Sequence, residues 1–534
     1  MDIRLNRRTL LAGAASLGMP LAMPRLAAAQ GSRVLKFIPQ IDLAFLDPHW
    51  TTAYVTRGHG HMVFDTLYGQ DSSFKASPQM VEGHVVADDG KLWTLTLRPG
   101  LLWHDGERVL ARDCVASIRR WAKRDALGGA LMAATEELSA PDDRTIRFRL
   151  SRPFPLLPEA LGKVSSPMPA MMPERLAETD PFKQITEMVG SGPFRFLADE
   201  RVAGSRNVYA KFEKYVPREG QRASWNAGPK LVHLDRVEWT TIPDAATKVA
   251  AIQRAEQDWW ENPTHDLLPL LRRDRRILIE VTNPTGTVCM MRPNHLQPPF
   301  DKPEARQALL HAFDQTAFMQ AIVGEDAAMY HVPHGIFCPN TPMASEAGLE
   351  PLKGPRDYEK ARRLLAEAGY GGETVALLVA TDYSHLKAIG EVMADAMGKI
   401  GLKVDYIATD WGTMLQRRNN RGPVAQGGWS CLTTSWEGAD HMDPASHYAI
   451  RGNGRDSGAW PGWCVSERLE QLRDAWFAAP DQAGQQAACR EMQVQAMRDV
   501  PSIPLGQYIQ PTAYRTNITG VAKGFPTFWG VQKG

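Results

Sequence analysis

Two hydrophobic patterns alternate along this chain, one with the period of a strand and one with the period of a helix. Residues 92–97 (LWTLTL) and 145–150 (TIRFRL) alternate apolar and polar positions, and residues 33–39 (RVLKFIP) form a short apolar run, so all three predict strands. Apolar side chains at helical spacing follow Asp113, which predicts a helix there. Because helices and strands interleave throughout, the pattern indicates an α/β chain.

The second half of the chain contains a strand, helix, strand unit. A helix that begins after Asp357 ends at Gly369 and is followed by an apolar run at 375–380 (VALLVA). A helix over 386–400 then leads to a second strand at 402–407. Such a unit normally carries two parallel strands joined by a covering helix.

The first thirty residues have the pattern of an export signal. Arg7 and Arg8 precede an apolar stretch from Leu10 to Met23, and a run of small residues ends at Ala29. This order predicts a Tat-type signal peptide at 1–29, whose cleavage leaves the mature protein in the periplasm. The apolar stretch is too short for a comfortable bilayer span, so we expect no permanent anchor.

Charge and cysteine content narrow the classes of partner. Lys and Arg (61) nearly balance Asp and Glu (60), which argues against nucleic acid as a partner. The six cysteines form no CxxC pair, so we expect no metal site and no cofactor. We interpret the cysteines as buried thiols with one or two disulfides, and Cys431 with Cys464 is the favoured pair.

Five segments occur in the order found in one large family of receptors. They are residues 88–112 (DDGKLWTLTLRPGLLWHDGERVLAR), 189–194 (VGSGPF), 242–258 (beginning IPD), 303–314 (PEARQALLHAFD) and 357–370 (DYEKARRLLAEAGY). Together they resemble the peptide-type and nickel-type solute-binding proteins of ABC importers, which include the dipeptide and oligopeptide receptors. The resemblance extends over nearly the whole mature chain.

The resemblance implies an α/β, two-lobed periplasmic binding protein fold of class II, the three-domain peptide-binding type, with a hinge between the lobes. It places the main domain of lobe I at residues 30–66, 190–285 and 508–534. It places an inserted domain of lobe I at 67–189 and lobe II, the ligand-binding domain, at 286–507.

The resemblance also implies that the protein binds a solute and catalyses no reaction. Such a receptor is no enzyme: it captures a small peptide or peptide-like solute between its lobes and delivers it to the ABC permease and ATPase complex in the inner membrane. We expect a periplasmic monomer.

The ligand site is expected in residues 427–444 (GGWSCLTTSWEGADHMDP), where Trp429 and Trp436 offer aromatic walls. By resemblance, an acidic residue a few positions before Asp-Pro binds the ligand's ammonium, and here that residue is Asp440. A carboxylate in a closed, dry cleft offers an amine a charge-assisted hydrogen bond of roughly 1.5–3 kcal/mol.

Three further aromatic residues complete the predicted site. Tyr383 matches a tyrosine that lies near the ligand-carboxylate arginine of the dipeptide receptors, but here that arginine is absent and Asp382 stands beside Tyr383. A cationic, amidated or longer solute is therefore favoured over a free dipeptide. In lobe I, Trp50 and Tyr54 follow a strand that ends at the cleft.

Two alternatives remain open at this point. The fold also allows a nonpeptide solute, such as an opine, a metal chelate, haem or an oligosaccharide, because function resides in the site. A periplasmic hydrolase would need a catalytic group such as His104 with Asp105, but adjacent residues of an extended segment point to opposite faces. A metal at His59 and His61 is disfavoured because residues two apart on a helix do not face each other.

Overall fold

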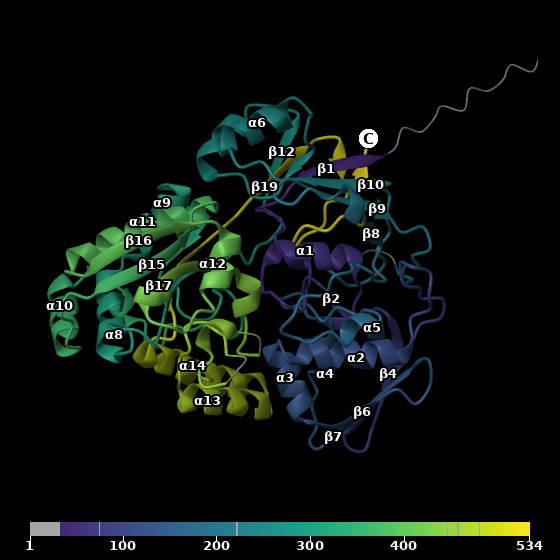
Figure 1. Cartoon of the computed structure of the whole chain (residues 1–534), viewed down its shortest axis with the longest axis horizontal. Helices are drawn as coiled ribbons and strands as arrows, with labels where there is room; N and C mark the ends of the chain where they lie inside the picture. Colours follow the sequence, from purple (N-terminus) through teal and green to yellow (C-terminus); the bar gives the residue numbers. More distant parts are fainter. Residues whose placement is uncertain (1–32, 74, 221–222, 446, 457–458, 480) are drawn as a thin grey trace, which may run out of the picture. The chain divides into compact units, whose positions relative to one another are not determined.

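The computed structural model describes residues 33–73, 75–220, 223–445, 447–456, 459–479 and 481–534. The predicted signal peptide at 1–29 lies outside these residues. Residues Arg33–Gly534 form one compact unit, and its sheets are shown in Figure 1.

A seven-stranded sheet forms the base of lobe I, in the order β12-β19-β11-β1-β10-β9-β8. Its strands are β1 (Val34–Ile38), β8 (Phe194–Phe196), β9 (Arg206–Lys211), β10 (Arg236–Thr240), β11 (Trp259–Trp260), β12 (Ile277–Glu280) and β19 (Thr512–Arg515). β1 runs parallel to both β10 and β11, so the carboxyl ends of β1 and β11 lie at the same edge. The strand predicted at 33–39 is confirmed.

A six-stranded sheet forms lobe II, in the order β14-β18-β13-β17-β15-β16. Its strands are β13 (Thr287–Pro293), β14 (Tyr330–His331), β15 (Thr374–Ala380), β16 (Lys403–Thr409), β17 (Cys431–Glu437) and β18 (Ile503–Tyr508). β15 and β16 are parallel, and α11 (Ser384–Lys399) connects them and packs on both, as the sequence predicted. Asp357 caps α10 (Tyr358–Glu367) through its carboxylate.

A third, antiparallel sheet of four strands has the order β4-β5-β7-β6. Its strands are β4 (Val81–Ala87), β5 (Leu92–Leu97), β6 (Thr135–Ser139) and β7 (Thr145–Leu150), which confirms the two alternating strands. The helix predicted between these two strands is α2 (Ala111–Ala122), which begins two residues earlier than expected. The carboxylate of Asp113 accepts from the backbone N–H of Leu110, so it caps the first turn from inside.

The remaining elements cover these sheets or connect them. The helices are α1 (Tyr54–Val63), α3 (Ala126–Ala133), α4 (Leu157–Gly162), α5 (Glu174–Ala177), α6 (Ala245–Gln253), α7 (Leu268–Leu271), α8 (Pro303–Ala312), α9 (Gln315–Val323), α12 (Trp411–Arg417), α13 (Glu467–Ala478) and α14 (Gln482–Asp499). The short strand pairs are β2 (Tyr68–Gln70) with β3 (Ala76–Pro78), and β20 (Ile518–Thr519) with β21 (Gln532–Lys533).

Two short segments connect the seven-stranded and six-stranded sheets. Residues 281–286 lead from β12 to β13, and residues 509–511 lead back from β18 to β19. They lie side by side because Glu280 pairs with Thr512 at one end and Thr287 pairs with Tyr508 at the other. This two-segment crossing is the hinge of the two-lobed fold. The domain boundaries at 66/67, 189/190, 285/286 and 507/508 stay a prediction.

Glycines hold the end of α1 against the chain after the third sheet. A Cβ on Gly190 would lie 2.0 Å from the carbonyl oxygen of Val63, so only glycine allows this close approach. The ring of His104 is 3.0 Å from the carbonyl oxygen of Gly192, whereas Asp105 pairs with Arg175. The structure therefore assigns His104 and Asp105 to different contacts and supports their interpretation as scaffold.

The disulfide prediction is wrong. All six cysteines are described, and each is a buried free thiol, including Cys431 and Cys464. Burial raises the pKa of the Cys464 thiol to about 11. These side chains act as small apolar groups of the core.

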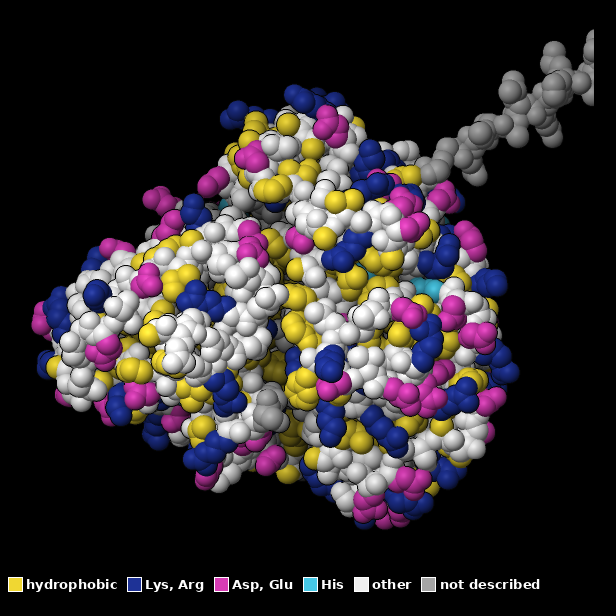
Figure 2. Space-filling model, in the orientation of Figure 1, with side chains coloured by type: hydrophobic (Ala, Val, Ile, Leu, Met, Phe, Trp, Pro, Cys, Tyr) yellow, Lys and Arg dark blue, Asp and Glu magenta, His cyan; other side chains and the backbone are white. Residues whose placement is uncertain are grey.

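The surface carries charges of both signs. On the face shown in Figure 2, Lys and Arg side chains are interspersed with Asp and Glu, and apolar side chains line a furrow down the middle of that face. Within the described residues, no helix combines the length and the apolar character that a membrane crossing requires.

Candidate ligand-binding site

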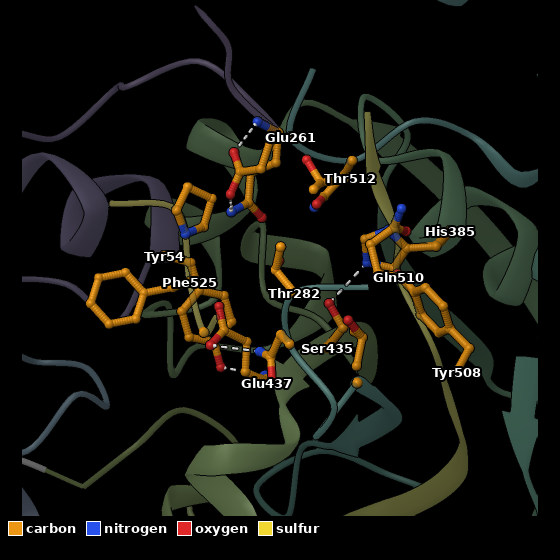
Figure 3. Close-up of a pocket in the computed structure, with 17 residues that line it drawn as sticks. Tyr54, Glu261, Thr282, His385, Ser435, Glu437, Tyr508, Gln510, Thr512 and Phe525 are labelled. Carbon is orange, nitrogen blue, oxygen red and sulfur yellow. Dashed lines mark hydrogen bonds between the residues drawn. The ribbon is translucent and has the colours of Figure 1, made fainter. Parts of the chain in front are cut away.

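A cavity at the hinge lies between the two lobes and contains about 620 Å³ of empty space, part of it open to solvent. We call it the hinge cavity. Figure 3 shows its side chains: Glu261 and Glu437 lie on two sides, Thr282 near the centre, and His385 and Tyr508 on the side opposite Tyr54 and Phe525. Both connecting segments contribute to the lining, so a bound solute would contact the parts that move when the lobes close.

Two neighbouring strand ends place Glu261 in this cavity. Gln40 follows β1 and Glu261 follows β11. The backbone N–H of Gln40 donates to one carboxylate oxygen at 2.6 Å, and its side-chain amide donates to the other at 3.0 Å. Burial raises the pKa of Glu261 to about 7, and the charge of Glu437 adds to this effect.

Glu437, at the end of β17, joins the lobes through Arg57 of α1. The two guanidinium nitrogens of Arg57 donate to the two carboxylate oxygens at 3.0 and 2.5 Å. The guanidinium also lies 4.6 Å from the ring centre of Tyr54 and 4.5 Å from that of Phe525. This forked ion pair between two rings is a strong contact between lobes.

Asp440 lies in the short 3-10 helix Gly438–His441 directly after β17. The hydroxyl of Tyr54 donates to Oδ2 of Asp440 and accepts from the backbone N–H of Glu437 at 2.6 Å. Oδ1 of Asp440 is buried and has no hydrogen-bond partner among the described residues. Burial raises the pKa of Asp440 to about 7, an effect that Arg57 opposes and Glu437 strengthens.

The acidic end of the cleft thus holds three carboxyl groups. Glu261 and Glu437 line the hinge cavity directly, and among the described residues that line it there is no lysine or arginine. Asp440 lies behind the hydroxyl of Tyr54. This arrangement can accept hydrogen bonds from a cationic or amine-bearing group.

A Ser–His pair also lines the hinge cavity. Nε2 of His385 and the hydroxyl oxygen of Ser435 are 2.9 Å apart. Burial, with a smaller effect of His265, lowers the pKa of His385 to about 3, so this imidazole is a poor proton acceptor near neutral pH. The pair is better suited to hydrogen-bonding a solute than to activating a nucleophile.

A second cavity continues from the first, and we call it the middle cavity. It shares Gln40, Tyr54 and Ser435 with the hinge cavity. Tyr383 and Trp436, both predicted site residues, line it. The hydroxyl of Tyr383 donates to the side-chain oxygen of Gln40 at 3.3 Å, which is another contact between lobes.

Asp382, beside Tyr383, has a structural partner. Its carboxylate accepts from the backbone N–H of Trp411, the first residue of α12. The indole of Trp411 packs edge-on against the ring of Tyr383, with 5.3 Å between ring centres. Asp382 therefore positions an aromatic wall of the middle cavity.

A third cavity opens beyond the middle one, and we call it the basic cavity. It shares Thr52 and Arg418 with the middle cavity, and Lys123, Arg124 and Arg421 also line it. Its aromatic residues are Trp50, Phe182, Tyr448, Trp460 and Trp463. The predicted site residue Trp50 thus lies at the basic rather than the acidic end.

Trp429 lies in the core beneath this cavity. It is fully buried, its indole N–H donates to the carbonyl oxygen of Arg418 at 3.0 Å, and its ring packs against Trp463. Its position supports a packing role, and its assignment as a ligand contact stays a prediction.

The histidine pair on α1 is split between two environments. His59 contacts the hydroxyl of Tyr209 at 2.9 Å, whereas His61 stacks on Phe525. Within the described residues, no group of three His, Cys, Asp or Glu side chains has the geometry to hold a metal.

The sequence did not reveal Glu261, Arg57 or Arg418 as cleft residues. Glu261 could have been found, because it follows a buried strand of two tryptophans in the way that ligand residues follow strands in α/β sheets. The two arginines carried no such signal.

Comparison with known proteins shows similarity to receptors that bind solutes. The sequence profile of the bacterial extracellular solute-binding proteins, family 5, matches residues 75–457. The chain is 37% identical to a probable peptide ABC transporter periplasmic-binding protein, y4tO, of Sinorhizobium fredii, over 99% of both chains. It is 26% identical to the glutathione-binding protein GsiB of Pectobacterium atrosepticum, over 73% of both.

Two solved structures share the fold. A periplasmic binding protein, AgaA of A. tumefaciens R10 with agropinic acid, has a TM-score of 0.78 and 21% identity, with 94% of this chain and 99% of that chain covered. DppA of Helicobacter pylori with the peptide STSA has a TM-score of 0.78 and 20% identity, with 94% and 98% covered. The chain belongs to family 5 of the bacterial extracellular solute-binding proteins, the solute-binding components of ABC importers.

Proposed function

We propose that this protein is the periplasmic receptor of an ABC importer for a small peptide or peptide-like solute that carries an amine. It binds the solute between its lobes, does not alter it, and delivers it to the permease and ATPase complex. The Tat-type signal proposed for residues 1–29 would export it already folded.

One observation supports the proposal that the bound solute carries an amine. The hinge cavity has two carboxylate side chains, Glu261 and Glu437, and no lysine or arginine among its described lining residues. Arg57 already neutralises Glu437, but Glu261 accepts, among the described residues, only the neutral donors of Gln40. A protonated amine would therefore find an uncompensated carboxyl group here, and Asp440, behind the hydroxyl of Tyr54, adds negative charge near it.

Equilibrium binding tests this proposal. Tri-alanine amide, which keeps its N-terminal amine, should quench or shift tryptophan emission, because indoles line the cleft. N-acetyl tri-alanine amide should bind at least about 10-fold more weakly, since it lacks the charge that the carboxyl groups recognise. Equal binding of both peptides, or chemical conversion of either, would contradict the proposal.

Two variants test which carboxyl groups contribute to binding of the amine. Glu261→Gln and Asp440→Asn keep the shape of each side chain and remove its charge, so each should weaken the amide about 10-fold. Asp395→Asn is the matched control, because Asp395 is an exposed carboxylate paired with Lys399 on α11. Mass spectrometry of the solute recovered after incubation checks that it is unchanged.

A further inference from the structure

One buried arginine in the cleft has no hydrogen-bond or ion-pair partner among the described residues. Six arginines are buried among the described residues. Arg57 and Arg120 pair with carboxylates, and three others donate to backbone carbonyl oxygens: Arg292, Arg306 and Arg473. The guanidinium of Arg418 makes no hydrogen bond or ion pair with the described residues, and its Nε is fully buried. It lies 5.7 Å from the ring centre of Trp460, a contact that does not compensate its charge.

An unpaired buried charge is costly. A guanidinium taken out of water without a partner loses several kcal/mol of hydration free energy. Burial, with a smaller effect of Arg124, lowers the pKa of Arg418 to about 10, so the group is still charged at neutral pH. Arg418 is 9% exposed, and the cavities it lines are where a partner could reach it.

The surroundings of Arg418 offer donors rather than acceptors. Lys123, Arg124 and Arg421 also line the basic cavity, and its described lining residues include no Asp or Glu. Three tryptophans that line the middle or basic cavity have buried indole N–H groups without a hydrogen-bond partner in the part of the chain that the structure describes: Trp411, Trp436 and Trp460. A group that only accepts hydrogen bonds and carries negative charge would satisfy this set.

The basic cavity and the hinge cavity belong to one cleft. The middle cavity shares Arg418 with the former and Tyr54 with the latter. The cleft therefore has carboxyl groups at one end and an unpaired guanidinium toward the other.

We infer that Arg418 binds an oxyanion of the transported solute, a carboxylate or a phosphate ester, so that the solute carries charges of both signs. This inference rests on the proposed function and narrows its solute class. It reverses the preference for amidated solutes that the missing arginine beside Tyr383 suggested. The anion is recognised from α12 and the loop after it rather than from the segment that holds Tyr383.

The test compares Arg418→Gln with the wild type and with Arg468→Gln. Arg468 is an exposed arginine of α13 paired with Glu491, so its variant loses one charge away from the cleft. Isothermal titration calorimetry would use tri-alanine with a free carboxylate and its C-terminal amide. We expect the wild type and Arg468→Gln to prefer the free acid, and Arg418→Gln to lose about 10- to 100-fold of affinity for the acid alone.

A second measurement does not need a peptide. Inorganic phosphate should raise the Tm of the wild type and of Arg468→Gln but not that of Arg418→Gln. Without any anion, Arg418→Gln should melt no lower than the wild type, because the substitution removes an unpaired buried charge. A merely structural arginine would give a lower Tm.

The outcomes separate the two proposals. If neither peptide binds the wild type, the function proposed above fails, and the phosphate measurement alone decides the role of Arg418. The inference is overturned if Arg418→Gln weakens the acid and the amide equally. It is also overturned if phosphate stabilises the wild type and Arg418→Gln alike, or stabilises neither.

Discussion

At the scale of single residues, the cleft is controlled by carboxyl groups that burial keeps partly protonated. Tyr54 is the first residue of α1, and its hydroxyl reaches Asp440 of the other lobe. Glu261 is held by Gln40 at the hinge cavity. Each carboxyl group must be ionised to bind an ammonium group with full strength.

We therefore expect the affinity for tri-alanine amide to rise with pH. The pKa values of Glu261 and Asp440 are both raised to about 7 by burial. A carboxyl group with that pKa is about one-tenth ionised at pH 6 and about nine-tenths ionised at pH 8. Because an α-amino group with a pKa of about 8 is at least half deprotonated at pH 8, the net gain is about 3- to 5-fold over this range. Titration calorimetry at both pH values measures it. Glu261→Gln should show a smaller rise, and a flat wild-type profile would refute this explanation.

At the scale of elements, α1 of lobe I makes several of the contacts with lobe II, beside those of Gln40 with Tyr383. Its first turn carries Tyr54 and Arg57, and both bind the end of β17. Its last turn is held by the close approach of Gly190 to Val63. The helix can present its polar side chains in the cleft only if both ends are fixed.

Arg57→Met should weaken solute binding by removing a contact that favours closure. Glu437 is 17% exposed and would be left without its cation, at a cost of about 1.5–3 kcal/mol, which corresponds to about 10- to 100-fold in affinity. Small-angle X-ray scattering of the variant with solute should show a more extended particle than the wild type. The double variant Arg57→Met with Glu437→Leu should recover part of the compaction, and no recovery would mean that the pair does not act as a unit.

Gly190→Ala should destabilise the protein. The new Cβ would meet the carbonyl oxygen of Val63 at 2.0 Å, so the backbone must shift, and we expect a loss of about 2 kcal/mol or more in the free energy of unfolding. Gly398→Ala is the matched control, because Gly398 lies within α11 with nothing within 4 Å of an added Cβ. Since alanine favours helix, this variant should gain about 1 kcal/mol. Urea unfolding distinguishes the two, and similar values for both would contradict the role of Gly190.

At the scale of the whole molecule, buried histidines link stability to pH. The rings of His441 and His447 stack with 3.9 Å between their centres. The charge of His334 lowers the pKa of His441, and the charge of His447 lowers the pKa of His334. Burial lowers the pKa of His334 and His447 to about 3, and it lowers the pKa of His441 well below its usual range. The folded protein therefore holds them neutral, while the unfolded chain takes up protons.

The free energy of unfolding should fall as pH drops below about 6.5. Because the unfolded chain binds more protons there, each such histidine contributes a loss of up to about 1.4 kcal/mol per pH unit. Urea unfolding at several pH values between about 7 and 4.5 measures the slope. His447→Gln should make the slope shallower. An unaltered slope in His447→Gln would exclude this source.

Local patterns of apolar and polar residues predicted much of the architecture. Alternation predicted β5 and β7, the apolar run predicted β15, and the helix between β15 and β16 predicted their parallel pairing. These features depend on short-range periodicity and on chain reversal through a covering helix. The five ordered segments also indicated the family, because they contain the glycine turns and helix caps that this fold needs at fixed places.

The cleft was predicted only in part. Tyr54, Tyr383 and Trp436 line the hinge or middle cavity, and the loop with Asp440 lies beside them. Trp50 lies at the other end of the cleft and Trp429 lies in the core. Both are outside the strands, where no alternation of apolar and polar positions indicates the direction of a side chain.

The sequence by itself determined the order and type of the elements and the family, since both depend on patterns within a few tens of residues. Only the tertiary structure decided which charged side chains line the cleft and which of them are paired. Glu437 is neutralised by an arginine 380 positions away, whereas Arg418 is buried and pairs with no carboxylate in the described part of the chain. Whether a charged side chain has a partner depends on which distant segments meet, and long-range packing sets this.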